Sequence, residues 1–95
     1  MKISKEKQEK ISEHILSLLY SISPKSLFTS HIAIEVARDE EFIKKILLKL
    51  KNKGILNQIQ KNKGGKQYLK RSRWSLSADV YSIYKKTQEQ EFSNT

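Results

Sequence analysis

The chain has 95 residues, and 19 Lys and Arg against 10 Asp and Glu give it a formal charge of +9. A domain of this length buries only a little over half of the surface of its unfolded chain, so we expect one compact domain without a deep pocket for a large substrate. Such a charge attracts polyanions, nucleic acid before anionic membrane surfaces. The absence of cysteine excludes a disulfide framework, a thiolate zinc site and a cysteine nucleophile.

Composition also argues against a membrane protein and an enzyme. No apolar run approaches the roughly 20 residues that span a bilayer, and the first ten residues lack the apolar segment of a signal peptide. We therefore expect a cytoplasmic protein, associated with the nucleoid or, for a viral protein, with the host cytoplasm. His14 and His31 are too few for a metal site. No catalytic set stands out, so we expect no enzyme, no cofactor and no small-molecule ligand.

The positive charge is concentrated in one segment. Between Phe42 and Ala78 the sequence has eleven basic residues and no acidic one, and all ten acids lie outside this segment. Abundant lysine can simply decorate a solvated surface. The length of the acid-free stretch instead favours a face that binds a polyanion.

The first predicted helix runs from about Ser4 to Ile22. Its apolar residues repeat with helical spacing and form one stripe: Ile11, Ile15, Leu18, Leu19 and Ile22. Ser4 is a plausible N-cap, and Pro24 ends the helix because it lacks an amide proton and restricts the residue before it.

Two shorter helices follow. After a short strand at 27–28, Thr29 or Ser30 is expected to cap a helix that runs to about Ala37. Asp39 is expected to cap the next helix, at about 40–53, and Gly54 to end it. The buried stripe of that helix comprises Ile43, Ile46, Leu47 and Leu50. The very short connection between the two helices predicts a helix-turn-helix arrangement.

A β-hairpin and a last helix complete the predicted elements. The strands are expected at 55–60 and 67–76, joined by a glycine-containing turn at 61–66. Trp74 and Leu76 are assigned to the core side, and Arg71 and Arg73 to the outer side. Ser77 is expected to cap a helix that runs to about Gln88. The chain thus reads as one domain over 1–95, with its core at about 10–87 and a frayed tail at about 89–95.

This order of elements resembles the winged helix-turn-helix family of DNA-binding regulators. The resemblance covers about residues 10–87 and is sharpest over 28–56. There the small Ala33, the acidic cap Asp39, two core leucines and a closing Gly-Ile-Leu fit the family pattern. It implies an α+β, mainly α fold: a three-helix core with a β-hairpin wing and a C-terminal helix. The Lys- and Ile-rich composition is similar to that of small regulators of thermophilic archaea and their viruses.

The resemblance also implies where double-stranded DNA binds. The helix at 40–53 is expected in the major groove and the wing at 55–76 on the backbone or minor groove. The implied contacts on the recognition helix are Glu41, Phe42, Lys44, Lys45 and Lys49. Those on the wing are Lys61, Lys63, Lys66, Arg71 and Arg73. Thr29 and Ser30 are expected to hold one further phosphate.

Two features depart from the family pattern. Glu40 and Glu41 stand where the recognition helix approaches DNA first; they repel phosphate, although one could accept from a cytosine N4 or serve the helix dipole. Phe42 replaces the usual Ser or Thr, and we expect it to pack partly into the core rather than against a thymine methyl. Both features bear on base readout more than on DNA binding itself.

Partners and alternatives complete the hypothesis. The last helix is the best candidate for a homodimer seam, through Val80, Ile83 and Tyr84 and with the first helix as a second element; two-fold symmetry would suit a palindromic site. Tyr81, Tyr84 and Trp74 are interpreted as packing residues rather than as stacking platforms for single strands. Two rival functions stay open: a winged helix that binds proteins within a larger assembly, and nucleic-acid binding without sequence preference.

Overall fold

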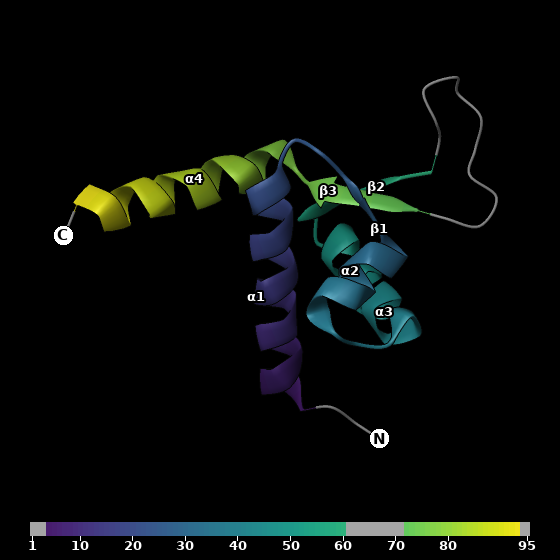
Figure 1. Ribbon diagram of the computed structural model, residues 1–95. Helices are drawn as coiled ribbons and strands as arrows, with labels where there is room; N and C mark the ends of the chain where they lie inside the picture. Colours follow the sequence, from purple (N-terminus) through teal and green to yellow (C-terminus); the bar gives the residue numbers. More distant parts are fainter. Residues whose placement is uncertain (1–3, 61–71, 94–95) are drawn as a thin grey trace.

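The computed structural model describes residues 4–60 and 72–93 (Figure 1). These residues form four helices and a three-stranded antiparallel sheet, mainly helical as predicted. The helices are α1 (Lys5–Ile22), α2 (Thr29–Val36), α3 (Glu40–Asn52) and α4 (Ala78–Ser93). The strands are β1 (Leu27–Phe28), β2 (Leu56–Ile59) and β3 (Arg73–Leu76), in the spatial order β1-β3-β2. In Figure 1 α2 and α3 lie to one side of α1 and below the sheet, while α4 leaves the body.

The start of α1 is set by the predicted cap. Ser4 is the N-cap, and its Oγ accepts a hydrogen bond from the Lys7 amide at 3.2 Å. Ile11, Ile15 and Leu19 are buried along one stripe of the helix, which confirms the predicted periodicity.

The α2–α3 turn depends on an unusual backbone residue. Ala37 has a φ of +58°, in the left-handed region that disfavours L side chains. This conformation returns the chain onto α2: the Ala37 amide donates to Ile34 O at 3.1 Å, and the Arg38 amide donates to Ala33 O at 3.0 Å. The carbonyls at the end of α2 are thereby satisfied, and the turn before α3 is kept to a few residues.

The predicted cap of α3 is confirmed, whereas that of α2 is wrong. Asp39 accepts a hydrogen bond from the Phe42 amide at 3.2 Å. Helix α2 begins at Thr29 itself, and its N-cap Phe28 makes no side-chain cap bond. The Thr29 hydroxyl oxygen instead accepts a hydrogen bond from Trp74 Nε1 at 2.8 Å, which draws the side chain into the core.

One hydrophobic core joins α1, α2 and α3 to the inner face of the sheet. Trp74 is fully buried and is the largest such side chain among the described residues. Leu56 and Leu76, which pair with each other two positions further along β2 and β3, lie beside it. The helical members of the core are Ile11, Ile15, Leu19, Ile32, Ala33, Val36, Ile43, Ile46, Leu47 and Leu50. All stand at positions spaced for one face of their helix.

Strand register separates an inner from an outer face. Trp74 pairs with Leu27 on one side and Gln58 on the other, and cross-strand partners share a face. Arg73 pairs with Phe28 and Ile59, which places it on the opposite, outer face. The predicted alternation is thus confirmed over 72–76, while residues 67–71 lie outside the described part of the chain.

Helix α4 begins as predicted but runs further. The Val80 amide donates to Ser77 Oγ at 3.3 Å and the Tyr81 amide donates to Ser77 O at 2.9 Å. The helix continues to Ser93, five residues past the predicted end near Gln88. Its last turns are rich in Lys, Gln and Glu, which are good helix formers.

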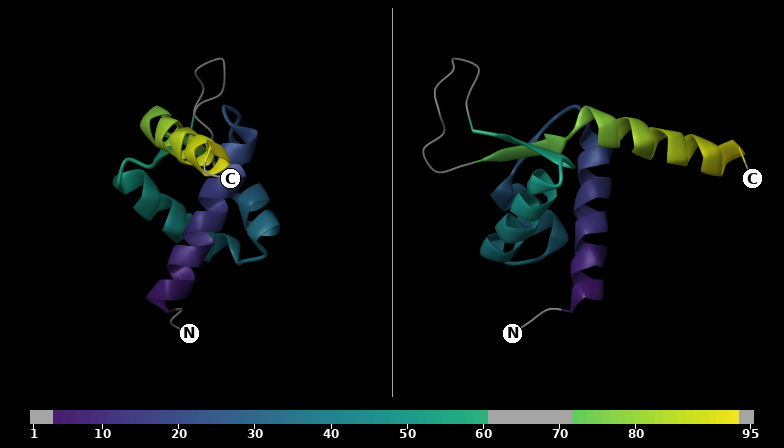
Figure 2. Two further views of the ribbon diagram at one scale, coloured as in Figure 1. Left: turned by 90° about the vertical axis from the view of Figure 1, so that its left-hand side faces the viewer. Right: turned by 180° about the vertical axis from the view of Figure 1, so that it is seen from behind.

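The projection of α4 is fixed at its base by an aromatic cluster. The Tyr20 ring lies 5.3 Å from that of Tyr81 and 4.8 Å from that of Tyr84, between centroids. Beyond this cluster α4 extends away from the body, roughly across the axis of α1, as the right-hand view of Figure 2 shows. Among the described residues, no helix is long and apolar enough to cross a membrane.

Candidate nucleic-acid interface

Helix α3 presents a charged face opposite its buried stripe. Glu41, Lys45 and Asn52 are spaced by four and seven residues, so they lie in one row on this face, and all three are exposed. Lys44 is exposed on the flank of the row. The structure thus brings two predicted lysines together on the outward side of the predicted recognition helix.

Asn52 belongs to this row but was not among the predicted contacts. An asparagine carboxamide can pair with both N6 and N7 of adenine, so Asn52 is a further candidate for base readout beside the lysines. The signal in the sequence was its spacing of seven from Lys45. An uncharged side chain at the end of a lysine-rich helix does not stand out by charge.

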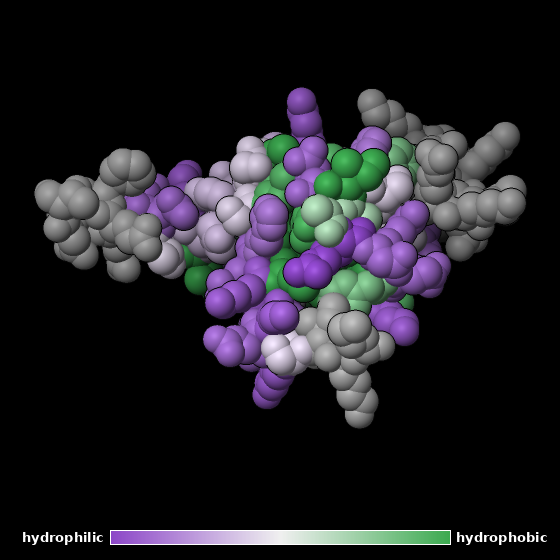
Figure 3. All heavy atoms as spheres, turned by 60° about the horizontal axis from the view of Figure 1, so that its bottom comes forward, coloured by the Kyte–Doolittle hydropathy of each residue, from purple (hydrophilic) through white to green (hydrophobic). Residues whose placement is uncertain are grey.

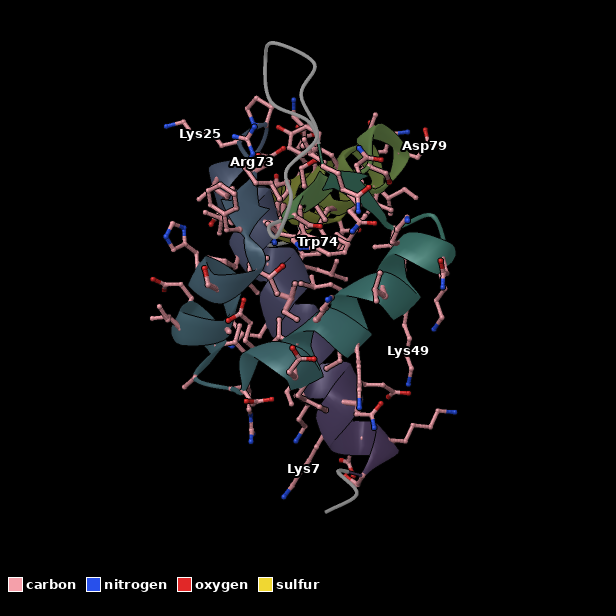
Figure 4. All side chains as sticks on the ribbon, turned by 90° about the vertical axis from the view of Figure 1, so that its right-hand side faces the viewer. Lys7, Lys25, Lys49, Arg73, Trp74 and Asp79 are labelled. Carbon is pink, nitrogen blue, oxygen red and sulfur yellow. The ribbon has the colours of Figure 1, made fainter. Side chains whose placement is uncertain are left out.

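Lys49 lies on the other flank of α3. With Lys5 and Lys53 it lines a groove of about 410 Å³ between α1 and α3, above Ile46 and Leu50. Figure 4 shows the Lys49 side chain running from α3 toward the first turns of α1. It therefore stands at the margin of the candidate interface and not in the central row.

The two departures from the family pattern have separate outcomes. Phe42 is half-buried and packs against the core, as predicted. Glu40 and Glu41 are both exposed in the first turn of α3. Their negative charge suits the helix N-terminus and opposes phosphate at the same place, so this end of α3 favours a base edge over the DNA backbone.

Thr29 and Ser30, predicted to hold one phosphate together, have different environments. Thr29 is only 9% exposed and contacts Trp74, so the structure places it in the core and outside the candidate interface. Ser30 is half-exposed and lines a shallow hollow with Ile34 and Glu40, between α2 and the start of α3. Only Ser30 of the pair remains available to a phosphate.

Arg73 is held at the base of the hairpin by its cross-strand neighbour. Its guanidinium carbon lies 5.7 Å from the centroid of the Phe28 ring, and the His31 ring meets the same Phe28 ring edge-on at 5.9 Å. Alternation along the strand predicted only that Arg73 points outward. The residue is half-buried, so its side chain is held more tightly than that prediction implied. Figure 4 shows Arg73 and Lys25 at the same end of the molecule. Lys25 is exposed and was not predicted as a contact.

The remaining predicted wing contacts, Lys61, Lys63, Lys66 and Arg71, lie outside the described residues. Hydrophilic side chains surround scattered hydrophobic ones on the face shown in Figure 3, which includes the α2–α3 end of the molecule. In the part of the chain that the structure describes, no three His, Cys, Asp or Glu residues gather in a group that could hold a metal ion.

Comparison with solved structures gives the class of the fold. The chain matches the MepR–DNA complex of Staphylococcus aureus with a TM-score of 0.67 and 18% identity, over 94% of this chain and 73% of that one. NadR in complex with 4-hydroxyphenylacetate matches with a TM-score of 0.62 and 17% identity, over 88% and 62% of the two chains. A possible transcriptional regulator from Methanosarcina mazei Go1 matches with a TM-score of 0.59 and 12% identity, over 97% and 75%.

These matches show a winged helix-turn-helix fold, in which α2 and α3 form the helix-turn-helix and β2 and β3 form the wing strands. The chain spans about two thirds of the length of a mutant MepR from a multidrug-resistant clinical isolate, 64% of that chain. No family model and no curated protein matches the sequence.

Proposed function

We propose that the protein binds double-stranded DNA as a transcriptional regulator and has no catalytic role. The observation that carries this proposal is the position of Lys44 and Lys45. Both are exposed on the face of α3 that a winged helix turns toward the major groove. The match to MepR, whose solved structure is a DNA complex, supports DNA binding by this fold.

The proposed contacts divide by their chemistry. Lys44, Lys45, Glu41 and Asn52 approach base edges, where lysine suits guanine O6 and N7 and a carboxylate suits cytosine N4. Ser30 and Arg73 bind phosphates, and the wing lysines and arginine add further phosphate contacts: Lys61, Lys63, Lys66 and Arg71. Lys49 contributes charge at the edge of the interface. A cytoplasmic location follows from this function as part of the proposal.

We further propose that two copies pair through α4. Ile83 is 64% exposed, although it stands near the base of a helix that leaves the body. Val80 and Tyr84 are half-buried on the same helix. An isolated helix of this length has only marginal stability in water. Contact with a second copy would therefore stabilise the projecting turns of α4. Such a pair would present two α3 helices to a palindromic site.

A matched pair of variants tests the DNA proposal. Lys44→Ala/Lys45→Ala removes two exposed charges from α3, whereas Lys85→Ala/Lys86→Ala removes two exposed charges from α4. Both lower the net charge equally, so a general polyanion effect weakens binding equally. We expect fluorescence anisotropy with a duplex selected from a random library to show at least tenfold weaker binding for the α3 pair, consistent with about 1–3 kcal/mol per base contact. Equal losses for both pairs would indicate binding by charge alone, and no duplex binding by the wild type would direct the search to a protein partner.

A further inference from the structure

The inner face of the sheet changes character where the hairpin leaves the body. Leu56, Leu76 and Trp74 cover the core, but the next positions on this face are Gln58 and Ser72. Gln58 is the cross-strand partner of Trp74, and Ser72 precedes Trp74 by two residues, so both share its face. The apolar core thus ends in a polar pair at the base of the hairpin.

Gln58 connects three elements through its carboxamide. Lys51 Nζ donates to Gln58 Oε1 at 2.8 Å, and Gln58 Nε2 donates to Ser72 Oγ at 2.9 Å. Lys51 is in the last turn of α3, Gln58 is on β2, and Ser72 leads into β3. The backbone carbonyl of Ser72 also accepts from the Thr29 amide at 3.3 Å, at the start of α2. A single side chain therefore joins the predicted recognition helix to both strands of the hairpin.

We infer that Gln58 is a positioning residue, which fixes the base of the wing against α3 so that the two DNA-contacting units bind as one rigid surface. This inference rests on the proposed function. Its physical reason is that wing and recognition helix must reach different parts of one duplex at the same time. A fixed geometry avoids the loss of conformational freedom that two independently moving units would undergo on binding. The bond from Lys51 also directs its ammonium group to the strand, away from the α3 face that carries Lys45.

The test compares Gln58→Met with Gln60→Met. Methionine matches glutamine in length and removes both hydrogen bonds, and Gln60 is an exposed residue two positions further along the same strand direction. We expect Gln58→Met to bind duplex DNA about tenfold more weakly, because the freed hairpin base must then be ordered against α3 on binding. The slope of log Kd against log salt should become shallower by about one unit, because the wing no longer holds a phosphate in register. Gln60→Met should match the wild type in both measurements.

A second pair of variants separates the effect of the Lys51–Gln58 hydrogen bond from the effect of losing one positive charge. Lys51→Met and Lys53→Met each remove one positive charge from the end of α3, but only Lys51 bonds to Gln58. Lys51→Met should weaken binding more than Lys53→Met and should reduce the effect of a further Gln58→Met change, because only the bond from Gln58 to Ser72 is then left to lose. Equal effects of the two lysine variants would overturn the inference.

Hydrogen exchange separates failure of this inference from failure of the proposed function. If Gln58 holds the hairpin base, Gln58→Met speeds amide exchange in residues 56–60 and 72–76 several-fold in the free protein. Faster exchange with unchanged DNA affinity and salt slope would show that Gln58 does not position the wing for binding. Weaker binding with a lower melting temperature and an unchanged slope would show a role in stability alone. Absence of DNA binding by the wild type would overturn the proposed function, and the positioning role with it.

Discussion

Trp74 donates the hydrogen of its indole nitrogen to Thr29 Oγ1 at 2.8 Å, and this bond joins the middle strand of the sheet to the first residue of α2. Trp74 has no exposed surface, so water cannot replace Thr29 as the acceptor. The bond sets where the helix-turn-helix begins relative to the wing strands.

Thr29→Val keeps the shape of the side chain and removes the acceptor. We expect this variant to lower the free energy of unfolding by about 1–3 kcal/mol, because it leaves a buried N–H without a partner. Urea denaturation followed by Trp74 fluorescence measures the change. In a Trp74→Phe background, followed by circular dichroism, the same substitution should cost much less, since no donor remains. Thr87→Val, at an exposed Thr on α4, is the control and should cost about 0.5 kcal/mol or less. A loss at Thr29 that is equal in both backgrounds would contradict this account.

Substitutions at two residues with positive φ are expected to change the stability of the protein in opposite directions. Ala37 carries steric strain at φ +58°, so Ala37→Gly should stabilise the protein by about 0.5 kcal/mol, the relief being partly offset by the greater freedom of glycine in the unfolded chain. Gly54 has a φ of +78° and open space around the position of a Cβ atom, so Gly54→Ala should destabilise by about 1 kcal/mol through the backbone alone. Chemical denaturation of both variants checks the signs. Destabilisation by Ala37→Gly would show that the turn carries no strain.

Two exposed large apolar side chains among the described residues allow a matched test of the dimer. Ile83 on α4 is 64% exposed and Ile34 on α2 is 74% exposed. If α4 pairs with a second copy, Ile83→Glu should convert the dimer to a monomer at tens of micromolar protein, because two buried carboxylates would face each other across the seam. Ile34→Glu should leave the dimer intact. Light scattering coupled to gel filtration distinguishes the two, and a monomeric wild type would exclude pairing through α4.

Local signals in the sequence were enough for much of the fold. Asp39 followed by two glutamates, and Ser4 before the first helix, are caps whose partners lie three residues away, so a linear reading finds them. The alternation around Trp74 likewise predicted which face of β3 meets the core. The helical period of α3 placed Lys44 and Lys45 on the exposed face.

The errors arose where the deciding contact is distant in sequence. Threonine is a residue type that often caps helices, so the sequence suggested that role for Thr29. Its hydrogen-bond partner Trp74 stands 45 positions later, and only the folded sheet brings the two together. The restraint on Arg73 depends in the same way on the pairing of β1 with β3. The role of Gln58 required the register of β2 as well as the end of α3.

The central claim is that the basic surface of α3 and the hairpin binds double-stranded DNA. Titration of a random duplex with the protein, followed by fluorescence anisotropy across a salt series, tests it most directly. About six phosphate contacts predict a slope of log K against log salt near about −5. A slope of this size would show that the basic surface displaces counterions from DNA. No binding at low salt would contradict the claim.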